Sequence, residues 1–221
     1  MRRVRLLKTL VFSGVRKLNR FERRTGLLRR GLDDQSRSLD QHQLEAEIGN
    51  LVINLQSYWS NWCRAYYLST ALGVTSTGGT LVSSALGIAT EHQAITVAIT
   101  GSLTPPRAPP AIWPSYREPK WFAPDDLSRV LTDAQVSVAA PATSFLGAMR
   151  ISLDHLRTMR NYYAHRSEEL RGSALALGPT YLVGAPRKAS EILLHVEPNR
   201  TVSVLERWVL DLKRLQAALC A

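Results

Sequence analysis

Apolar residues recur at steps of three and four along long stretches of the chain, which is the spacing of one face of an α-helix. The first stretch covers residues 4–21, with apolar residues or glycine at Val4, Leu7, Val11, Gly14, Leu18 and Phe21. The clearest stretch follows a capping signal, Asp40 with Gln43, and extends toward Gly73. Its apolar positions are Leu44, Ile48, Leu51, Leu55, Tyr58 and Trp62. Both patterns predict long helices, and the aromatic residues of the second suit either core packing or base stacking.

The helical pattern continues in the second half of the chain. Asp125 and Asp126 open one helix, and an uninterrupted helix is predicted from residue 142 to about residue 171. The stripe of this long helix consists of Phe145, Met149, Leu153, Leu156, Met159 and Tyr163. A capping box of Ser203 and Glu206 begins the last helix. Its stripe consists of Leu205, Trp208, Leu212, Leu215 and Leu219.

Three intervening segments differ in character. Residues 81–99 predict a further helix, with a short strand at residues 95–100 as the alternative. Residues 104–124 hold seven of the eleven prolines and four aromatic residues, which predicts a packed surface loop. Residues 180–183 and 191–196 are interpreted as a short β-hairpin. The expected fold class is therefore mostly α, a bundle of long antiparallel helices with a short hairpin near residues 180–196.

The charge of the chain is concentrated at its beginning. Residues 1–30 contain eleven Lys and Arg and one acidic residue, whereas the remainder contains 17 of each sign. This division predicts a basic amphipathic helix or arm over residues 1–30 and one helical domain over residues 31–221. The basic face of the arm is interpreted as a solvated surface, with RNA phosphates or a membrane surface as alternatives. The arm residues expected to contact RNA are Arg16, Lys17, Arg20, Arg23 and Arg24.

Several classes of protein are excluded by composition. Two cysteines, Cys63 and Cys220, form neither a disulfide framework nor a zinc motif. No stretch is long and apolar enough to cross a membrane, and the apolar run Thr9–Phe12 is too short for a signal peptide. We therefore expect a cytoplasmic protein that has no membrane partner.

The segment with the clearest potential for chemistry is Arg160-Asn161-Tyr162-Tyr163-Ala164-His165-Arg166. None of the five histidines has a metal-binding spacing, no Gly-x-Ser-x-Gly elbow occurs, and Cys63 lies within an apolar helix. Arginine and histidine together suit RNA cleavage without a metal or cofactor. An imidazole can accept the proton of a 2′-hydroxyl or protonate the leaving oxygen, and a guanidinium can stabilise the charged phosphorane.

This segment resembles the Arg-x(4–6)-His signature of the HEPN superfamily, with Asn161 directly after the arginine. The resemblance covers about residues 140–170. It implies a helical bundle and a metal-independent endoribonuclease, often a toxin or anti-phage effector controlled by an antitoxin, whose motif meets a second copy across a homodimer. Two other segments, Arg37-x4-His42 and Arg150-x4-His155, share the spacing but lack the context of Asn after Arg and Ala before His.

The expected catalytic residues are Arg160, Asn161 and His165, with Tyr162 and Arg166 as further RNA contacts. On a regular helix Arg160 and His165 point about 140° apart, whereas Asn161 and His165 are about 40° apart. One copy would therefore have difficulty aiming both Arg160 and His165 at one phosphate, and a symmetric dimer would not. The alternative function is a non-catalytic helical module that binds nucleic acid or protein through the basic arm.

Overall fold

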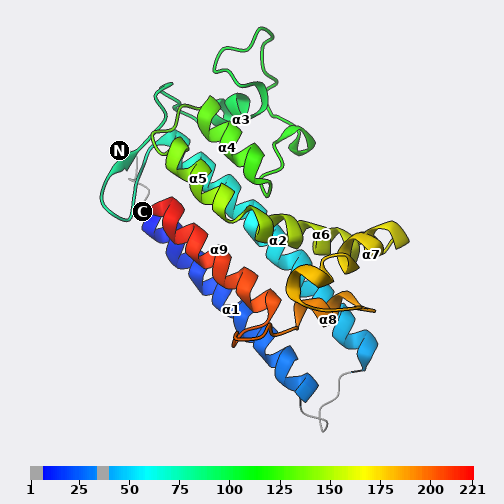
Figure 1. Ribbon diagram of the computed structural model, residues 1–221. Coiled ribbons are helices and arrows are strands. Elements are labelled where there is room, and N and C mark those ends of the chain that lie inside the picture. Colours follow the sequence, from blue (N-terminus) through cyan, green and yellow to red (C-terminus); the bar gives the residue numbers. More distant parts are fainter. Residues whose placement is uncertain (1–6, 34–39) are drawn as a thin grey trace. The chain divides into compact units, whose positions relative to one another are not determined.

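The computed structural model describes residues 7–33 and 40–221, and this part of the chain is mostly helical (Figure 1). The α-helices are α1 Leu7–Asp33, α2 Gln41–Leu72, α3 Glu91–Thr100, α4 Pro124–Asp133, α5 Ala139–Ala148, α6 Arg150–His165, α7 Glu168–Leu175, α8 Ala189–Leu193 and α9 Val204–Cys220. Two 3₁₀ turns, η2 Ser115–Arg117 and η3 Gly178–Tyr181, lie between them. Strands β1 Val74–Thr75 and β2 Leu81–Val82 pair antiparallel, with Val74 opposite Val82.

The chain divides into two compact units, and both contain parts of α1, α2 and α9. The first unit comprises the described residues up to Gly14 together with Trp59–Arg150 and Arg214–Ala221. The second unit comprises Val15–Tyr58 and Ile151–Lys213. The predicted catalytic segment belongs to the second unit.

The core of the first unit is built on the aromatic end of α2. The rings of Trp59, Trp62 and Tyr66 stack in succession, with centroids 5.5 and 5.3 Å apart. The hydroxyl of Tyr66 donates to the carbonyl oxygen of Leu219 at 2.9 Å, and that of Tyr67 donates to Ala94 at 2.8 Å. The aromatic stripe of α2 is therefore core packing here rather than an open stacking surface.

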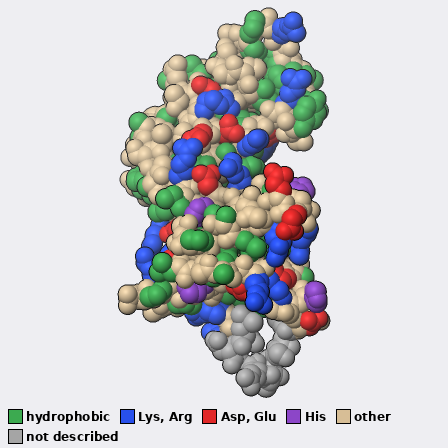
Figure 2. Space-filling model, turned by 45° about the vertical axis from the view of Figure 1, so that its right-hand side comes forward, with side chains coloured by type: hydrophobic (Ala, Val, Ile, Leu, Met, Phe, Trp, Pro, Cys, Tyr) green, Lys and Arg blue, Asp and Glu red, His purple; other side chains and the backbone are tan. Residues whose placement is uncertain are grey.

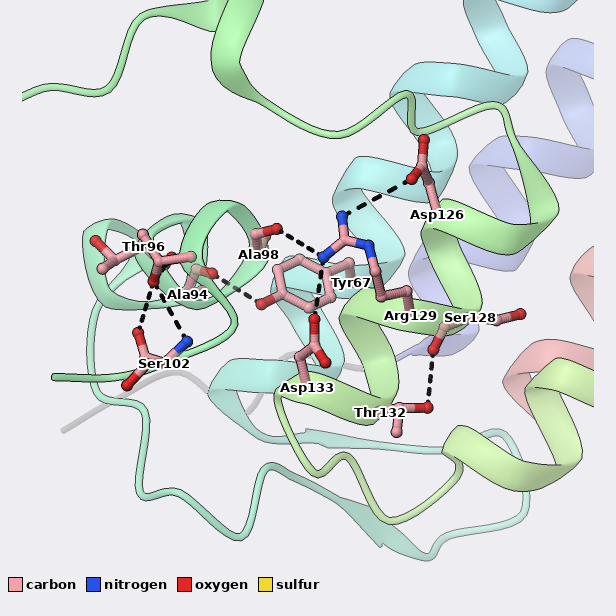
Figure 3. Close-up of polar contacts among 11 residues, drawn as sticks. Tyr67, Ala94, Thr96, Ala98, Ser102, Asp126, Ser128, Arg129, Thr132 and Asp133 are labelled. Carbon is pink, nitrogen blue, oxygen red and sulfur yellow. Dashed lines mark hydrogen bonds and ion pairs between the residues drawn. The ribbon is translucent and has the colours of Figure 1, made fainter. Parts of the chain in front are cut away.

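Arg129 fastens α4 to α3 within the first unit (Figure 3). Its guanidinium donates to the carboxylate of Asp133 at 3.0 Å and to the carbonyl oxygen of Ala98 at 3.4 Å. A second carboxylate, that of Asp126, lies 3.8 Å away. The Arg129 guanidinium thus pairs with two carboxylates of α4 and also donates a hydrogen bond to a backbone carbonyl near the end of α3.

The Pro-rich loop, residues 104–124, is fixed to the first unit at several points but is not fully packed. Trp121 is buried, and the indole N–H of Trp113 donates to Thr96 at 2.9 Å. Glu118 accepts hydrogen bonds from Arg64 and Trp121. Burial acts to raise the pKa of this carboxyl group, but these hydrogen bonds outweigh burial and hold the pKa below its ordinary value. Tyr116, by contrast, is 81% exposed, so the expectation that all four aromatic residues pack is wrong for this one.

Pairs of side chains in the second unit show that its helices run antiparallel. Glu22 of α1 pairs with Lys213 of α9 at 2.5 Å, and Arg29, further along α1, lies 3.7 Å from Glu206, earlier in α9. Because the residue numbers of these pairs rise along α1 and fall along α9, the two helices run in opposite directions. The same order holds between α1 and α2, where Phe21 contacts Tyr58 and Arg24 pairs with Glu47.

The structure confirms the mostly helical class and the predicted positions of α2 and α9. Helix α2 begins directly after Asp40, and α9 begins after the capping box, in which Ser203 N–H donates to Glu206 at 2.7 Å and Glu206 N–H donates to Ser203 at 3.3 Å. Helix α1 also follows the predicted stripe, since Leu7 and Leu18 are buried. Val4 lies outside the described residues.

The predicted uninterrupted helix over residues 142–171 is wrong, because the structure divides this region into α5, α6 and α7. Met149 separates α5 from α6, and Arg166 with Ser167 separates α6 from α7. The buried face also changes between these helices. In α5 Ala142 and Leu146 are buried while the predicted Phe145 is 40% exposed. Helix α5 starts before Pro141. Proline has no backbone N–H, but it is tolerated here because N–H groups in the first turn of a helix have no partner within the helix.

The hairpin predicted near residues 180–196 is also wrong. Residues 180–183 overlap only the end of the turn η3, and residues 191–196 overlap only the end of the short helix α8, which buries Ala189, Ile192 and Leu193. A short apolar run cannot distinguish a strand from a buried helical turn by spacing alone. The hairpin of this fold is β1–β2, closed by a turn in which Ser76 Oγ accepts from the N–H groups of Gly78 and Thr80 at 3.2 Å.

The segment predicted as a helix over residues 81–99 begins as β2, and α3 starts only at Glu91, after the N-cap Thr90. The alternative of a strand at residues 95–100 is wrong, since these residues are helical. In the described part of the chain no helix is both long and apolar enough to span a bilayer.

Candidate functional site

The predicted catalytic segment occupies the last turns of α6, whose apolar stripe holds it in the second unit. Leu153, Leu156, Met159 and Tyr163 are buried along one face of this helix. Arg160 and Asn161 are half-buried beside that face, and Ala164 and His165 are exposed. Burial of the stripe therefore leaves His165 exposed and Arg160 and Asn161 partly accessible to solvent.

Arginine and asparagine of the segment are in contact with each other. The Nη1 atom of Arg160 donates a hydrogen bond to Oδ1 of Asn161 at 3.3 Å. His165 follows Asn161 by four residues, so the two share one helical face. Arg160 is thus bonded to the Asn161 side chain, which lies on the same helical face as His165. Arg160 and His165 of one molecule are not hydrogen-bonded to each other.

The helix ends directly after the imidazole because Arg166 adopts a left-handed backbone. Its φ angle is 53°, and its N–H closes back on the carbonyl oxygen of Tyr162 at 2.8 Å. Ser167 then caps α7 by accepting from the N–H of Leu170 at 3.2 Å. The predicted catalytic segment consequently lies at a corner between α6 and α7.

The guanidinium of Arg166 folds back over the two tyrosines of the segment. Its Cζ atom lies 5.4 Å from the ring centroid of Tyr163 and 5.9 Å from that of Tyr162. Tyr163 is 5% exposed and belongs to the core stripe, and Tyr162 is half-buried. Of the predicted RNA contacts here, Arg166 is exposed and Tyr162 only partly so.

The second Arg-x4-His segment, on the same helix, is engaged in structural contacts. Arg150 forms two hydrogen bonds with Asp125, at 3.0 and 2.5 Å. Nδ1 of His155 lies 2.6 Å from the hydroxyl of Tyr181, and burial lowers the pKa of this imidazole. The third match is described only at His42, since Arg37 lies outside the described residues.

The predicted RNA-binding residues of α1 all have exposed side chains: Arg16, Lys17, Arg20, Arg23 and Arg24. The contacts of two of them reach α2, because Arg24 pairs with Glu47 and the Lys17 ammonium lies 5.8 Å from the Tyr58 ring centroid. On the face drawn in Figure 2, basic and acidic side chains are interspersed. The excess of basic residues at the start of the sequence is thus partly neutralised by pairing across helices.

A groove that the sequence did not indicate lies along α1 in the second unit. It has a volume of about 510 Å³ and is lined by Asn19, Glu22, Arg23, Gly26, Arg30 and Glu206. Its two carboxylates are matched by cations, since Glu22 pairs with Lys213 and Glu206 with Arg29. Arg23, one of the predicted RNA contacts, lines this groove.

The two cysteines are inert, and the described residues form no metal site. Burial raises the pKa of the Cys63 thiol well above its ordinary value and that of Cys220 to about 12, so both are protonated core residues at neutral pH. Among residues 7–33 and 40–221 no group of three or more His, Cys, Asp and Glu side chains is arranged to hold a metal ion.

Two residues that no sequence motif indicated, Glu45 and Gly49, contact the predicted catalytic segment, and a third, Ser190, contacts Glu45. Glu45 accepts a hydrogen bond from the hydroxyl of Tyr163, Ser190 bonds to the same carboxylate, and Gly49 lies against the Tyr163 ring. They come from α2 and α8, far from the segment in sequence. Comparison with known proteins adds no further site, because no family model, curated protein or solved structure matches the chain.

Proposed function

We propose that the chain is a metal-independent endoribonuclease of the HEPN type that works as a homodimer. The observation that carries the proposal is an exposed imidazole, His165, at an open helix corner, one helical turn after the Arg160–Asn161 pair. Supporting it, the competing Arg150 and His155 are occupied by structural partners. The resemblance of the segment to the HEPN signature supplies the reaction type.

In the proposed reaction the 2′-oxygen of a ribose attacks the adjacent phosphorus and the bond from phosphorus to the 5′-oxygen breaks. His165 accepts the 2′-hydroxyl proton or donates a proton to the leaving 5′-oxygen. Arg160 stabilises the added negative charge on the phosphorane, and Asn161 orients Arg160 through the hydrogen bond between them. The products are a 2′,3′-cyclic phosphate and a 5′-hydroxyl.

A second copy of α6 completes the proposed site. Arg160 and His165 point in different directions on their own helix, and the exposed, small Ala164 lets another helix approach closely. Arg160 of one copy and His165 of the other can then face the same phosphate. RNA is the proposed substrate, and an antitoxin or other regulatory protein is the partner that the resemblance suggests.

The test is cleavage of a fluorescent single-stranded RNA with a chelator present. We expect Arg160→Ala and His165→Ala each to lower the rate about 100-fold or more, because acid–base and charge-stabilising groups contribute at this level. Matched controls are Arg157→Ala, an exposed arginine of the same helix, and His42→Ala, an exposed histidine with the same Arg-x4-His spacing. Both controls should cut at the wild-type rate.

Mixing the two inactive variants tests the composite site. A mixed dimer retains one Arg160 and one His165, so cleavage should return in part on mixing. Absence of cleavage by the wild type, or equal cleavage by wild type and His165→Ala, would contradict the proposal. Loss of wild-type cleavage on chelation alone would contradict the metal-independent mechanism.

A second candidate is a non-catalytic module that binds nucleic acid through α1, and the exposed basic side chains of that helix favour it. This function predicts RNA binding that is unchanged in His165→Ala and is abolished when the basic residues of α1 are neutralised. The cleavage assay distinguishes the two candidates.

A further inference from the structure

The last turn of α6 is held against α2 by a close contact that requires glycine. The Tyr163 ring lies directly on the backbone of α2, so that a Cβ atom at Gly49 would come within 2.7 Å of Cδ1 of Tyr163. At the far end of the ring, the Tyr163 hydroxyl donates to Oε2 of Glu45 at 3.0 Å. Gly49 and Glu45 are one helical turn apart, and together they fix both the face and the tip of this side chain.

The carboxylate of Glu45 joins three helices of the second unit. Its Oε2 atom accepts from Tyr163 of α6, and its Oε1 atom accepts from the hydroxyl of Ser190 of α8. Ser190 and Tyr163 are 6% and 5% exposed, so both hydrogen bonds are largely shielded from water. Burial, followed by the charge of Glu45, raises the pKa of Tyr163, and its hydroxyl therefore stays a donor at all working pH values. Such a shielded contact has one geometry rather than several.

The groups around Tyr163 are held in place by contacts with its ring and with the adjacent backbone. The Arg166 guanidinium rests over the Tyr163 ring, and the Arg166 N–H closes on Tyr162, which fixes the corner after His165. On the preceding turn Arg160 is bonded to Asn161. The residues with proposed chemistry thus lie within three positions of one anchored ring.

From this arrangement we propose that Glu45 and Ser190 are positioning residues, which act through Tyr163 to hold Arg166 and the last turn of α6 in the geometry that RNA cleavage needs. The inference rests on the proposed function for its catalytic consequence. Neither residue touches the substrate; their effect is on orientation, and a displacement of about 1 Å can lower a rate about 100-fold.

Cleavage kinetics of Glu45→Ala, Ser190→Ala and Glu45→Gln test the catalytic consequence, each well below the melting temperature of the variant. We expect kcat to fall about 10- to 100-fold in Glu45→Ala and less in Ser190→Ala, with KM for RNA within about twofold of wild type. Glu45→Gln should recover most of kcat, because its amide can accept from Tyr163 and donate to Ser190. The control is Tyr181→Phe, which removes another buried hydroxyl with two hydrogen-bonding partners in the same unit. It should lower the melting temperature and leave kcat unchanged.

An NMR measurement tests the same anchor independently of cleavage. The side-chain N–H resonance of Arg166 should lie upfield in the wild type, because two tyrosine rings shield it, and should move toward the free-arginine position in Glu45→Ala but not in Glu45→Gln. Wild-type kcat in Glu45→Ala, or an unmoved Arg166 resonance, would overturn the inference. If the wild type cleaves no RNA, the proposed function fails, and the resonance alone decides whether the anchor orients Arg166.

Discussion

At the scale of single residues, Arg166 adopts a backbone conformation that is unfavourable for any residue other than glycine. A left-handed conformation is adopted most easily by glycine and costs other residues about 1 kcal/mol. Here the position is occupied by arginine with φ at 53°. The Arg166 guanidinium lies over the rings of Tyr162 and Tyr163, and these contacts offset part of the cost.

Comparison of Arg166→Gly with Arg166→Ala separates the two effects. Both variants lack the guanidinium, but only glycine relieves the backbone, so we expect the free energy of unfolding to be about 1 kcal/mol higher in Arg166→Gly than in Arg166→Ala. RNA affinity should fall equally in both. Urea unfolding and fluorescence anisotropy provide the measurements. Equal stability of the two variants would show that the left-handed backbone at this position is not strained.

The residues of the candidate site were only partly predictable from the sequence. Arg160, Asn161 and His165 could be proposed from the sequence because the signature is local, and Tyr163 was correctly placed on the core stripe because helical spacing is local too. Glu45, Gly49 and Ser190 were not found, since they reach the segment only through tertiary packing. An acid near the start of α2 and a serine in α8 carry no signal that pairs them with a tyrosine far along the chain.

At the scale of elements, helix starts with a side-chain cap were predictable and interruptions within an apolar pattern were not. The capping box of Ser203 and Glu206 fixed the start of α9. The break after α6 had a usable signal in Ser167, an N-cap followed by two acidic residues, but the apolar spacing on either side concealed it. At the break the backbone of Met149 leaves the helical region, with φ −100° and ψ 6°, and the continuous apolar spacing of Phe145, Met149 and Leu153 concealed this break too.

Contacts between elements also predict how stability depends on pH. His155 links α6 through Tyr181 to Trp208 of α9, and burial lowers the pKa of its imidazole below the ordinary value of 6.5. Below pH 6.5 the unfolded chain gains this proton before the folded chain does, so acid favours unfolding. The contribution of the neutral His155 imidazole to stability is fully present above pH 6.5 and is lost as the pH falls toward the lowered pKa of His155 in the folded protein.

We therefore expect His155→Gln, which does not titrate, to lose less stability than the wild type between about pH 7 and pH 5. Urea unfolding at a series of pH values measures this difference in slope. His42→Gln, at the exposed start of α2, is the matched control and should follow the wild-type curve. A slope in His155→Gln equal to that of the wild type would show that burial of this imidazole does not govern the response to acid.

At the scale of the whole molecule, the net charge of +10 describes the chain less well than its distribution does. Several exposed arginines are neutralised by nearby acids on their own helix, as Arg157 is by Asp154 and Arg171 by Glu168. The basic residues of α1 have fewer acidic neighbours along the sequence, and Arg23 lines the groove on this helix. RNA phosphates should therefore prefer α1 over other basic surfaces of similar formal charge.

Neutralising three residues of α1, with Lys17→Gln, Arg20→Gln and Arg23→Gln combined, tests this preference. RNA affinity should fall, and the slope of log affinity against log salt should decrease by roughly 0.7 for each phosphate that the variant no longer neutralises. Under the proposed function, kcat at saturating RNA should stay the same. The control combines Arg157→Gln, Arg171→Gln and Arg200→Gln, an equal change of charge at paired sites. An equal fall in affinity in both triple variants would mean that total charge, rather than α1, attracts RNA.

The absence of a side chain at position 49 has a consequence for how this protein can change over time. The space above Gly49 is already filled by the ring of Tyr163, so volume at these two positions is shared. A methyl group gained on α2 would have to be accompanied by a smaller side chain on α6, and the smaller side chain would give up the hydroxyl that reaches Glu45. Descendants of this sequence are therefore expected to keep both residues or to exchange them as a pair.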